Sequence, residues 1–139
     1  MSENAKKIVV VLNEKIETGK AMNALAHAML GFGAGVVSRE DVKLNEYIDA
    51  DGNIHDNISE MAIVVLKAKS QHIRTLRTEC IAHSMRFVAF TESMSIGTYY
   101  EEYELTKTIP ESKLNYFAII IMGDHGIVSE ITRKLSLYR

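Results

Sequence analysis

The chain has 139 residues, of which 47% are hydrophobic and 24% are charged, and its formal net charge is −2. This length and composition suit one compact globular domain and exclude a disordered chain. The slightly negative charge argues against an extended surface for binding nucleic acid, which needs an excess of positive charge. A single cysteine, together with an N-terminus that shows no secretory or membrane-spanning pattern, predicts a cytoplasmic protein without a membrane partner.

The first half of the chain begins as a strand and then a helix. Residues 6–12 are an apolar, β-branched run that is typical of a buried strand. Residues 18–32 are expected to form a helix, because a threonine at its start can act as the cap and glycines erode its end. Residues 45–57 are expected to form a hairpin insertion with a two-residue turn at Asp51-Gly52.

The second half repeats apolar strands separated by helices. Strands are expected at residues 61–68, 86–90 and 115–122. Helices capped by Ser70 and by Asp124 are expected after the first and the last of these strands, and a loop with one short helix at residues 91–112. The pattern predicts a single α/β domain over residues 1–139, with three layers and a mostly parallel or mixed sheet of about four core strands.

The helix expected over residues 18–32 has two unlike sides. Its large apolar residues share one side and are expected to face the core: Met22, Leu25, Met29, Phe32 and Val36. Lys20, Asn23 and His27 share the opposite side, which is otherwise made of small residues: Ala24, Gly31, Ala34 and Gly35. A lysine in the first turn opposes the helix dipole unless an anion lies there. This side either contacts a ligand, a loop or a second subunit, or is simply solvated.

Thr91 and Glu92 follow the strand expected at residues 86–90. In open α/β sheets, ligands collect at the carboxyl ends of the strands. If that edge lies beside Lys20 and His27, then a lysine, a histidine and a carboxylate converge, which suffices for general acid–base chemistry or for holding a polar ligand. Otherwise Glu92 is a solvated loop carboxylate.

No metal site and no cofactor are expected. The histidines have no metal-ligand spacing, and Cys80 falls on the apolar side of the helix that follows Ser70. Three glycines at positions 31, 33 and 35 end a helix instead of following a strand, so they do not form a dinucleotide-binding turn.

Two charged segments leave alternatives open. Arg74 and Arg77 share one side of a helix and either contact phosphate or form a solvated face. Tyr99, Tyr100 and Tyr103 lie among glutamates and form either a lid or partner surface or ordinary packing.

The opening of the chain resembles that of the type 2 peptidyl-tRNA hydrolases. The resemblance lies in Gly19-Lys20, followed seven residues after the lysine by His27-Ala28 on the helix after the first strand. It implies the fold of those enzymes and places Lys20 and His27 at an active site. The family's glutamine is replaced by Ala24, and Thr91 to Ser95 stand where that family has its aspartate–threonine segment.

Nearly the whole chain resembles a second family with that hydrolase-like fold, the domain of unknown function 2000. The resemblance lies in the opening strand and helix, in the segment DADGN at Asp49 to Asn53, and in the ending from Leu114 to Arg139. It implies a fold more firmly than an activity, since one fold hosts many functions.

Two functions remain open. The first is the binding of a small anionic or nucleotide-linked ligand, such as a phosphate-bearing one, in a cleft beside the first helix, with Gly19, Asn23 and Thr91 as binding residues. The second is the hydrolysis of an ester such as peptidyl-tRNA or a related small substrate. There Lys20 holds an anion, His27 or Glu92 acts as the base, and Thr91 or Asn23 orients the substrate. A homodimer through the small-residue side or the tyrosine segment is a further hypothesis.

Overall fold

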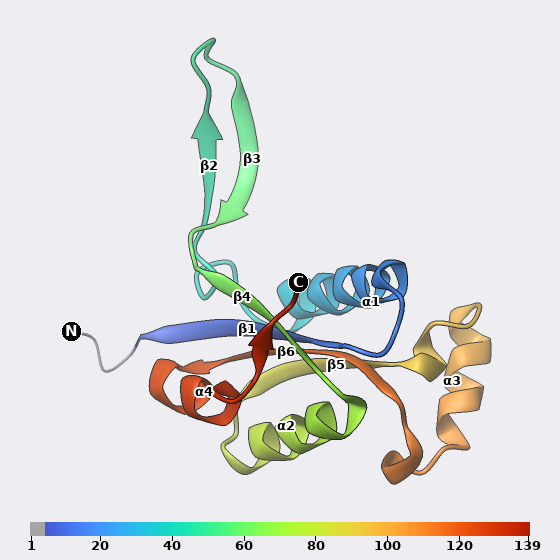
Figure 1. The fold of residues 1–139 in the computed structure, drawn as a ribbon. Coiled ribbons are helices and arrows are strands. Elements are labelled where there is room, and N and C mark those ends of the chain that lie inside the picture. Colours follow the sequence, from blue (N-terminus) through green and yellow to red (C-terminus); the bar gives the residue numbers. More distant parts are fainter. Residues whose placement is uncertain (1–4) are drawn as a thin grey trace.

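A five-stranded mixed sheet forms the centre of the molecule in a computed structural model that describes residues 5–139 (Figure 1). The strand order is β5-β6-β1-β4-β7, with bounds β1 Lys6–Asn13, β4 Ile63–Ala68, β5 Arg86–Thr91, β6 Tyr116–Asp124 and β7 Ser136–Leu137. Within the described residues, β1 and β4 are the only parallel pair, and β6 runs antiparallel to both β1 and β5. The α/β domain with a mixed sheet is confirmed, whereas a mostly parallel sheet is wrong.

The path between β5 and β6 explains this difference. The helix α3 (Tyr99–Lys107) in this connection lies beyond the end of β5 and does not cross a face of the sheet (Figure 1). The chain therefore re-enters the sheet from the edge at which it left, so β6 runs antiparallel to β5. A parallel pair would need a crossover that returns the chain to the opposite edge.

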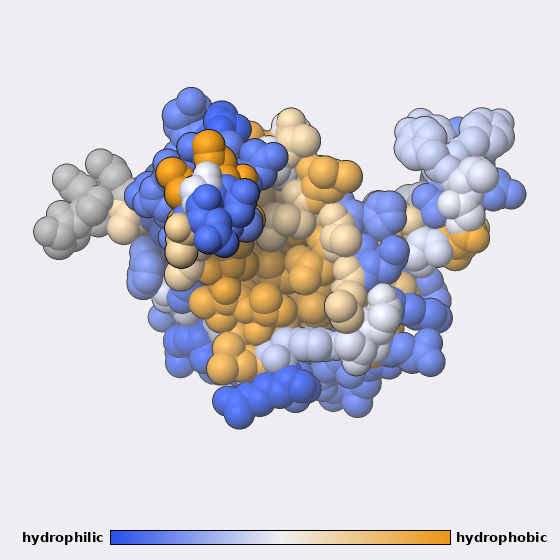
Figure 2. Space-filling view, turned by 90° about the horizontal axis from the view of Figure 1, so that it is seen from above, coloured by the Kyte–Doolittle hydropathy of each residue, from blue (hydrophilic) through white to orange (hydrophobic). Residues whose placement is uncertain are grey.

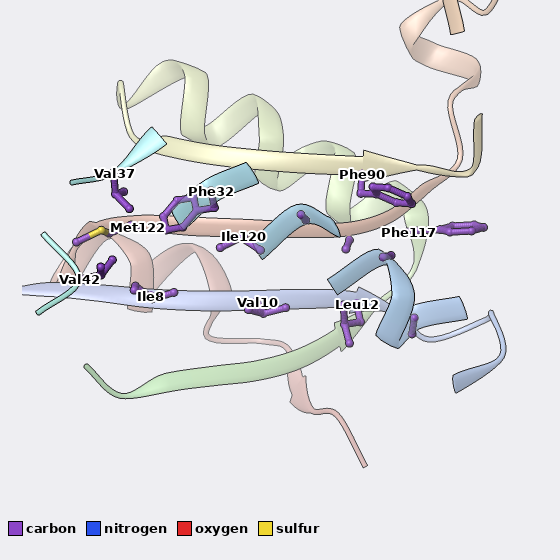
Figure 3. Packing of buried hydrophobic residues seen from close by; sticks show 14 residues of the cluster. Ile8, Val10, Leu12, Phe32, Val37, Val42, Phe90, Phe117, Ile120 and Met122 are labelled. Atoms are coloured by element: carbon purple, nitrogen blue, oxygen red, sulfur yellow. The ribbon is translucent and has the colours of Figure 1, made fainter. Parts of the chain in front are cut away.

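Helices cover the sheet unequally. The helix α1 (Thr18–Gly31), which continues into one π-helical turn at Phe32–Val36, lies on one face, while α2 (Ser70–Ala82) and α4 (His125–Thr132) lie on the other (Figure 1). Each face of the sheet has its own apolar core. In the core under α1, Phe32 packs with strand residues that include Ile8, Val10 and Ile120 (Figure 3).

The side of α1 that packs on the sheet is not the side expected from its large apolar residues. Ala21, Ala24 and Ala28 are at most 2% exposed, whereas Met22 is 62% exposed. Of the expected core residues only Phe32 is buried, since Leu25 and Met29 are half-buried and Val36 is exposed. The strands already fill the layer with Ile, Val, Phe and Met side chains, so the helix can approach closely only through alanines.

The helix caps follow the sequence in part. Asp124 accepts a hydrogen bond from the Ile127 N–H at 3.1 Å, which confirms it as the cap of α4. Thr18 is instead the first residue of α1, after a cap position at Glu17. Ser70 is the first residue of α2, and its hydroxyl accepts the Tyr116 N–H at 2.9 Å. That hydroxyl thus satisfies a buried strand donor instead of its own helix.

The hairpin of β2 (Leu44–Ile48) and β3 (Ile54–Ser59) is confirmed, and it stands away from the sheet as a separate two-stranded unit (Figure 1). Its turn spans Asp49 to Asn53, so the expected two-residue turn is wrong. The Asp49 carboxylate accepts the N–H groups of Asp51 and Asn53, each at 3.0 Å, which stabilises the wider turn. Gly52 has a φ of 87°, a conformation that favours glycine.

The C-terminal end adds a short strand that the sequence does not predict. The helix α4 ends at Thr132, and the chain then adds β7 beside β4.

Cys80 is buried, and burial raises the pKa of its thiol to about 12, which keeps it protonated and unreactive. In residues 5–139, every helix is too short or too polar to cross a membrane.

Candidate functional site

Polar residues from three strands meet at one edge of the sheet. Here β1 ends at Asn13, β5 ends next to Glu92, and β6 begins after Asn115. The Asn13 side-chain amide donates to the Tyr116 carbonyl at 2.8 Å and lies 3.5 Å from the Asn115 side-chain oxygen. The Asn115 amide in turn donates to Glu92 at 3.4 Å. This chain of amides holds the Glu92 carboxylate at the strand edge.

A pocket of about 420 Å³ opens at this edge, beside the first turn of α1. It brings together four of the residues that the sequence singles out, which are Gly19, Lys20, Asn23 and Glu92. Ser95, Ile96 and Phe117 complete its wall. Lys20 is exposed and forms no ion pair with any residue between 5 and 139.

A larger pocket of about 930 Å³ adjoins the first, because Asn23 and Ser95 line both. Its walls come from α1, the β5 edge and α3, and they include His27, Phe90 and Tyr103. The His27 ring stacks on the Phe90 ring with centroids 5.7 Å apart. On α3, the Tyr99 and Tyr103 rings stack at 5.9 Å. The cleft beside α1 thus has a charged end and a more apolar, aromatic end.

Thr91 is buried behind this wall, with 1% of its surface exposed. Its hydroxyl lies 2.9 Å from the Ser93 hydroxyl, to which Thr106 of α3 donates at 2.8 Å. The three hydroxyls tie the end of β5 to α3 across the 3₁₀ turn at Glu92–Met94. Thr91 therefore fixes the backbone that carries Glu92, and its own hydroxyl faces away from solvent.

Asn115, which holds Glu92 at this site, is not among the site residues that the sequence predicts. Asn115 and Asn13 are polar residues that directly flank buried strands. In a parallel sheet, however, the start of the last strand lies at the edge opposite to the end of β5. The antiparallel direction of β6 brings Asn115 to Glu92. Ser95 and Phe90 carry no comparable signal in the sequence.

The basic residues of α2 are used within the protein. Arg74 pairs with Glu111 at 3.1 Å and lies over the Tyr116 ring at 5.2 Å, while Arg77 lies over the Phe87 ring at 6.0 Å. A hydrogen bond from Tyr116 and the adjacent Arg74 lower the pKa of Glu111. Arg74 therefore fits neither a phosphate contact nor a solvated face, because Glu111 and the Tyr116 ring hold its guanidinium within the protein. No group of three His, Cys, Asp or Glu side chains between residues 5 and 139 could hold a metal ion.

Comparisons with known proteins agree with this architecture. The family described as "Protein of unknown function (DUF2000)" matches residues 6–139. A solved structure of a protein of unknown function, Atu0240 from Agrobacterium tumefaciens strain C58, matches with a TM-score of 0.82 at 20% sequence identity and covers 100% of both chains. At that identity the likeness shows the fold. No curated protein matches the sequence. Because the family match spans nearly the entire chain, the protein belongs to the DUF2000 family.

Proposed function

We propose that this protein binds a small phosphate-bearing ligand in the cleft beside α1. The observation that carries the proposal is the gathering of Lys20, Asn23 and Glu92 around one pocket that opens into a second, more apolar one. A ligand pocket is usually a mostly apolar concavity with a few convergent polar groups, and the two adjoining pockets have this character.

The smaller pocket supplies the polar contacts. Lys20 would balance the negative charge of a phosphate near the N-terminal end of α1, where the helix dipole also favours an anion. Gly19 leaves open space at this point, since a side chain there would meet nothing within 4 Å. Glu92 would repel a phosphate but accept a hydrogen bond from a hydroxyl or amino group. The ligand would therefore carry a hydroxyl or amine beside its phosphate, as nucleotides and sugar phosphates do.

The larger pocket would hold the body of the ligand. His27 and Phe90 offer a stacked pair of rings, and Tyr103 faces the same space from α3. Planar or apolar groups pack well against such rings. Asn23 lies where the two pockets meet and would hold the group that joins the phosphate to this body.

Ester hydrolysis is the second candidate, in keeping with the resemblance to the type 2 peptidyl-tRNA hydrolases. Lys20 and Glu92 line one pocket, so a bound ester would have a cation and a carboxylate beside it. His27 lines the adjoining pocket instead, so Glu92 and His27 are alternative bases for one scissile bond. A net charge of −2 and the missing aspartate–threonine segment favour a small ester over peptidyl-tRNA itself.

A binding screen with Lys20→Met tests the proposal. Nucleotides and sugar phosphates are first screened by thermal shift, because a bound ligand raises apparent stability. Calorimetry on the best compound should then show about tenfold to a hundredfold weaker binding to Lys20→Met, the effect of one lost charged hydrogen bond. Lys134→Met, which removes an exposed lysine after α4, should bind as the wild type does.

Two results would contradict the binding proposal: no phosphate compound binds, or both lysine variants bind equally well. The same compounds, offered as esters, separate binding from catalysis. Turnover that is lost in Glu92→Gln or in His27→Ala would identify the base of the hydrolase, whereas binding without turnover supports a binding protein.

A further inference from the structure

The sheet face that carries α1 is only partly covered. The helix presents Lys20, Asn23 and His27 to the β5 side, and its other flank, with Met29 and Leu30, lies toward β4. Register partners show that Ile63, Val65 and Lys67 of β4 lie on this same face, because they pair with Ile8, Val10 and Leu12 of the core under α1. In α/β domains such a face is normally covered by helices.

An apolar groove of about 380 Å³ results on the β4 side of α1. Its walls include Met29 and Leu30 of α1, Val42 and Leu44 at the base of the hairpin, and Ile63 of β4. Leu30 is 72% exposed and Ile63 is 41% exposed. Seen from above α1, apolar residues gather in one continuous, hollowed area beside the hairpin (Figure 2). Continuous apolar areas of this kind mark interaction sites.

The hairpin itself carries exposed isoleucines. Ile48 and Ile54 are register partners and share one face, whereas a bulge in β3 puts Ile58 on the opposite face, where it pairs with Asn45. The three isoleucines are 66%, 64% and 58% exposed. A two-stranded hairpin that stands alone in water is marginally stable, and exposed isoleucines add to that cost. The hairpin therefore has the character of an arm that packs against another surface.

The hairpin differs from the rest of the chain in its charge. Residues 44–59 contain Glu46, Asp49, Asp51 and Asp56 and neither lysine nor arginine. The remaining residues then hold 14 acidic side chains against all 16 lysines and arginines. On the uncovered face, Lys67 is half-buried at the end of the Ile63–Val65 row and forms no ion pair within residues 5–139. An acidic apolar arm thus complements this face in both charge and apolarity.

We propose that two copies of this chain form a two-fold dimer in which the hairpin of each copy lies in the apolar groove of the other. Each chain carries both the arm and the groove on the same side of the sheet, which is the condition for a self-complementary two-fold interface. Ile48 and Ile54 pack against Leu30 and Ile63 of the second copy. Acidic residues of the arm approach Lys67 of that copy.

The hairpin cannot fill the groove of its own chain. Its base is fixed by the Ser59 hydroxyl, which donates to the Val42 carbonyl at 2.6 Å, and by the Arg86–Asp41 ion pair at 2.7 Å. From this base the strands lead away from the sheet and from α1 (Figure 1). Folding the hairpin back would break these contacts, so the occupant that fits is the arm of a second copy.

Sedimentation equilibrium of the full chain over a micromolar concentration series tests the proposal. The wild type should behave as a dimer. Ile54→Glu on the arm and Leu30→Glu beside the groove should each raise the dissociation constant by about tenfold or more. Ile81→Glu changes an isoleucine that is 55% exposed on α2, on the other face of the sheet, and should leave the dimer intact. Thermal melts of all variants check that each one folds.

A mixture of the two disruptive variants gives the sharper result. One copy with Ile54→Glu and one with Leu30→Glu leave one of the two arm–groove contacts unchanged. The mixture should therefore associate more tightly than either variant alone. A monomeric wild type would overturn the proposal, as would a dimer that Ile81→Glu weakens as much as the other two. A monomer whose groove instead binds an unrelated apolar peptide would also overturn it.

Discussion

Tyr116 joins the start of β6 to the connection that carries Glu111. Its side chain is fully buried, its hydroxyl donates to the Glu111 carboxylate at 2.7 Å, and Arg74 lies over its ring. Burial, and then the hydrogen bond to Glu111, raise the pKa of the phenol to about 12. Because Asn115 is the preceding residue, this anchor also fixes the backbone behind the Glu92 pocket.

This pKa shift predicts a loss of stability at high pH. The phenol ionises near pH 10 in the unfolded chain and near pH 12 in the folded one, so folding opposes ionisation. The protonated phenol contributes fully to the stability of the fold below pH 10. Between pH 10 and 12 the free energy of unfolding decreases by about 2 kcal/mol as this contribution is lost. Urea unfolding across this range should show the loss in the wild type and not in Tyr116→Phe. Tyr100→Phe, at an exposed tyrosine, should retain it; the same pH slope in all three proteins would contradict the assignment.

The close approach of α1 to the sheet is the element that shapes both flanking surfaces. Ala21, Ala24 and Ala28 let the helix lie on Ile8, Val10 and Ile120, and the bulkier Met22 and Leu30 remain exposed. The helix therefore leaves room on each flank, for the polar cleft toward β5 and for the apolar groove toward β4.

Ala24→Leu should destabilise the protein, because three extra carbons at a position with 0% exposure force the helix off the sheet. Overpacking of this kind costs about 1 to 3 kcal/mol. Ala26→Leu makes the same change two residues away at an exposed position and should alter stability by less than about 0.5 kcal/mol. Urea denaturation of both variants measures the difference. Equal effects would mean that the alanine side of α1 does not face the sheet.

The sequence predicts most of the elements but not how two of them are placed. Helical spacing correctly groups Met22, Leu25 and Met29 on one side of α1 and Lys20, Asn23 and His27 on another. It cannot tell which side faces the sheet, because that depends on how much space the strand side chains leave. Burial of alanines is favoured only when the opposing layer is bulky, and this is a property of the assembled core.

The position of Asn115 shows a second limit. Local pattern identifies β6 as a buried strand but carries no information about its direction, which depends on where α3 lies. The sequence alone predicts that a strand end and the start of the following helix lie at one edge of a sheet. It can therefore place one group of residues near each other, which are Gly19, Lys20, Asn23 and Glu92. Asn115 and Phe117 join them only because β6 is antiparallel.

At the scale of the whole molecule, α1 separates two surfaces of opposite character. The cleft proposed for a phosphate compound lies on its β5 side, and the groove proposed for the partner's arm lies on its β4 side. The two sets of lining residues have none in common. Because the helix is packed through alanines between them, it has little freedom to move toward either surface.

Ligand binding and dimerisation should therefore be independent. Coupling between two sites requires that each ligand shift an element shared by both, and such coupling is reciprocal. Ile54→Glu, as a monomer, should bind the best phosphate compound within about twofold of the wild-type affinity, whereas Lys20→Met should retain the wild-type dimer constant. Calorimetry and sedimentation on both variants check the two statements. A tenfold change in ligand affinity on loss of the dimer would show that the two sites are coupled, and reciprocity then requires the ligand to change the wild-type dimer constant by the same factor.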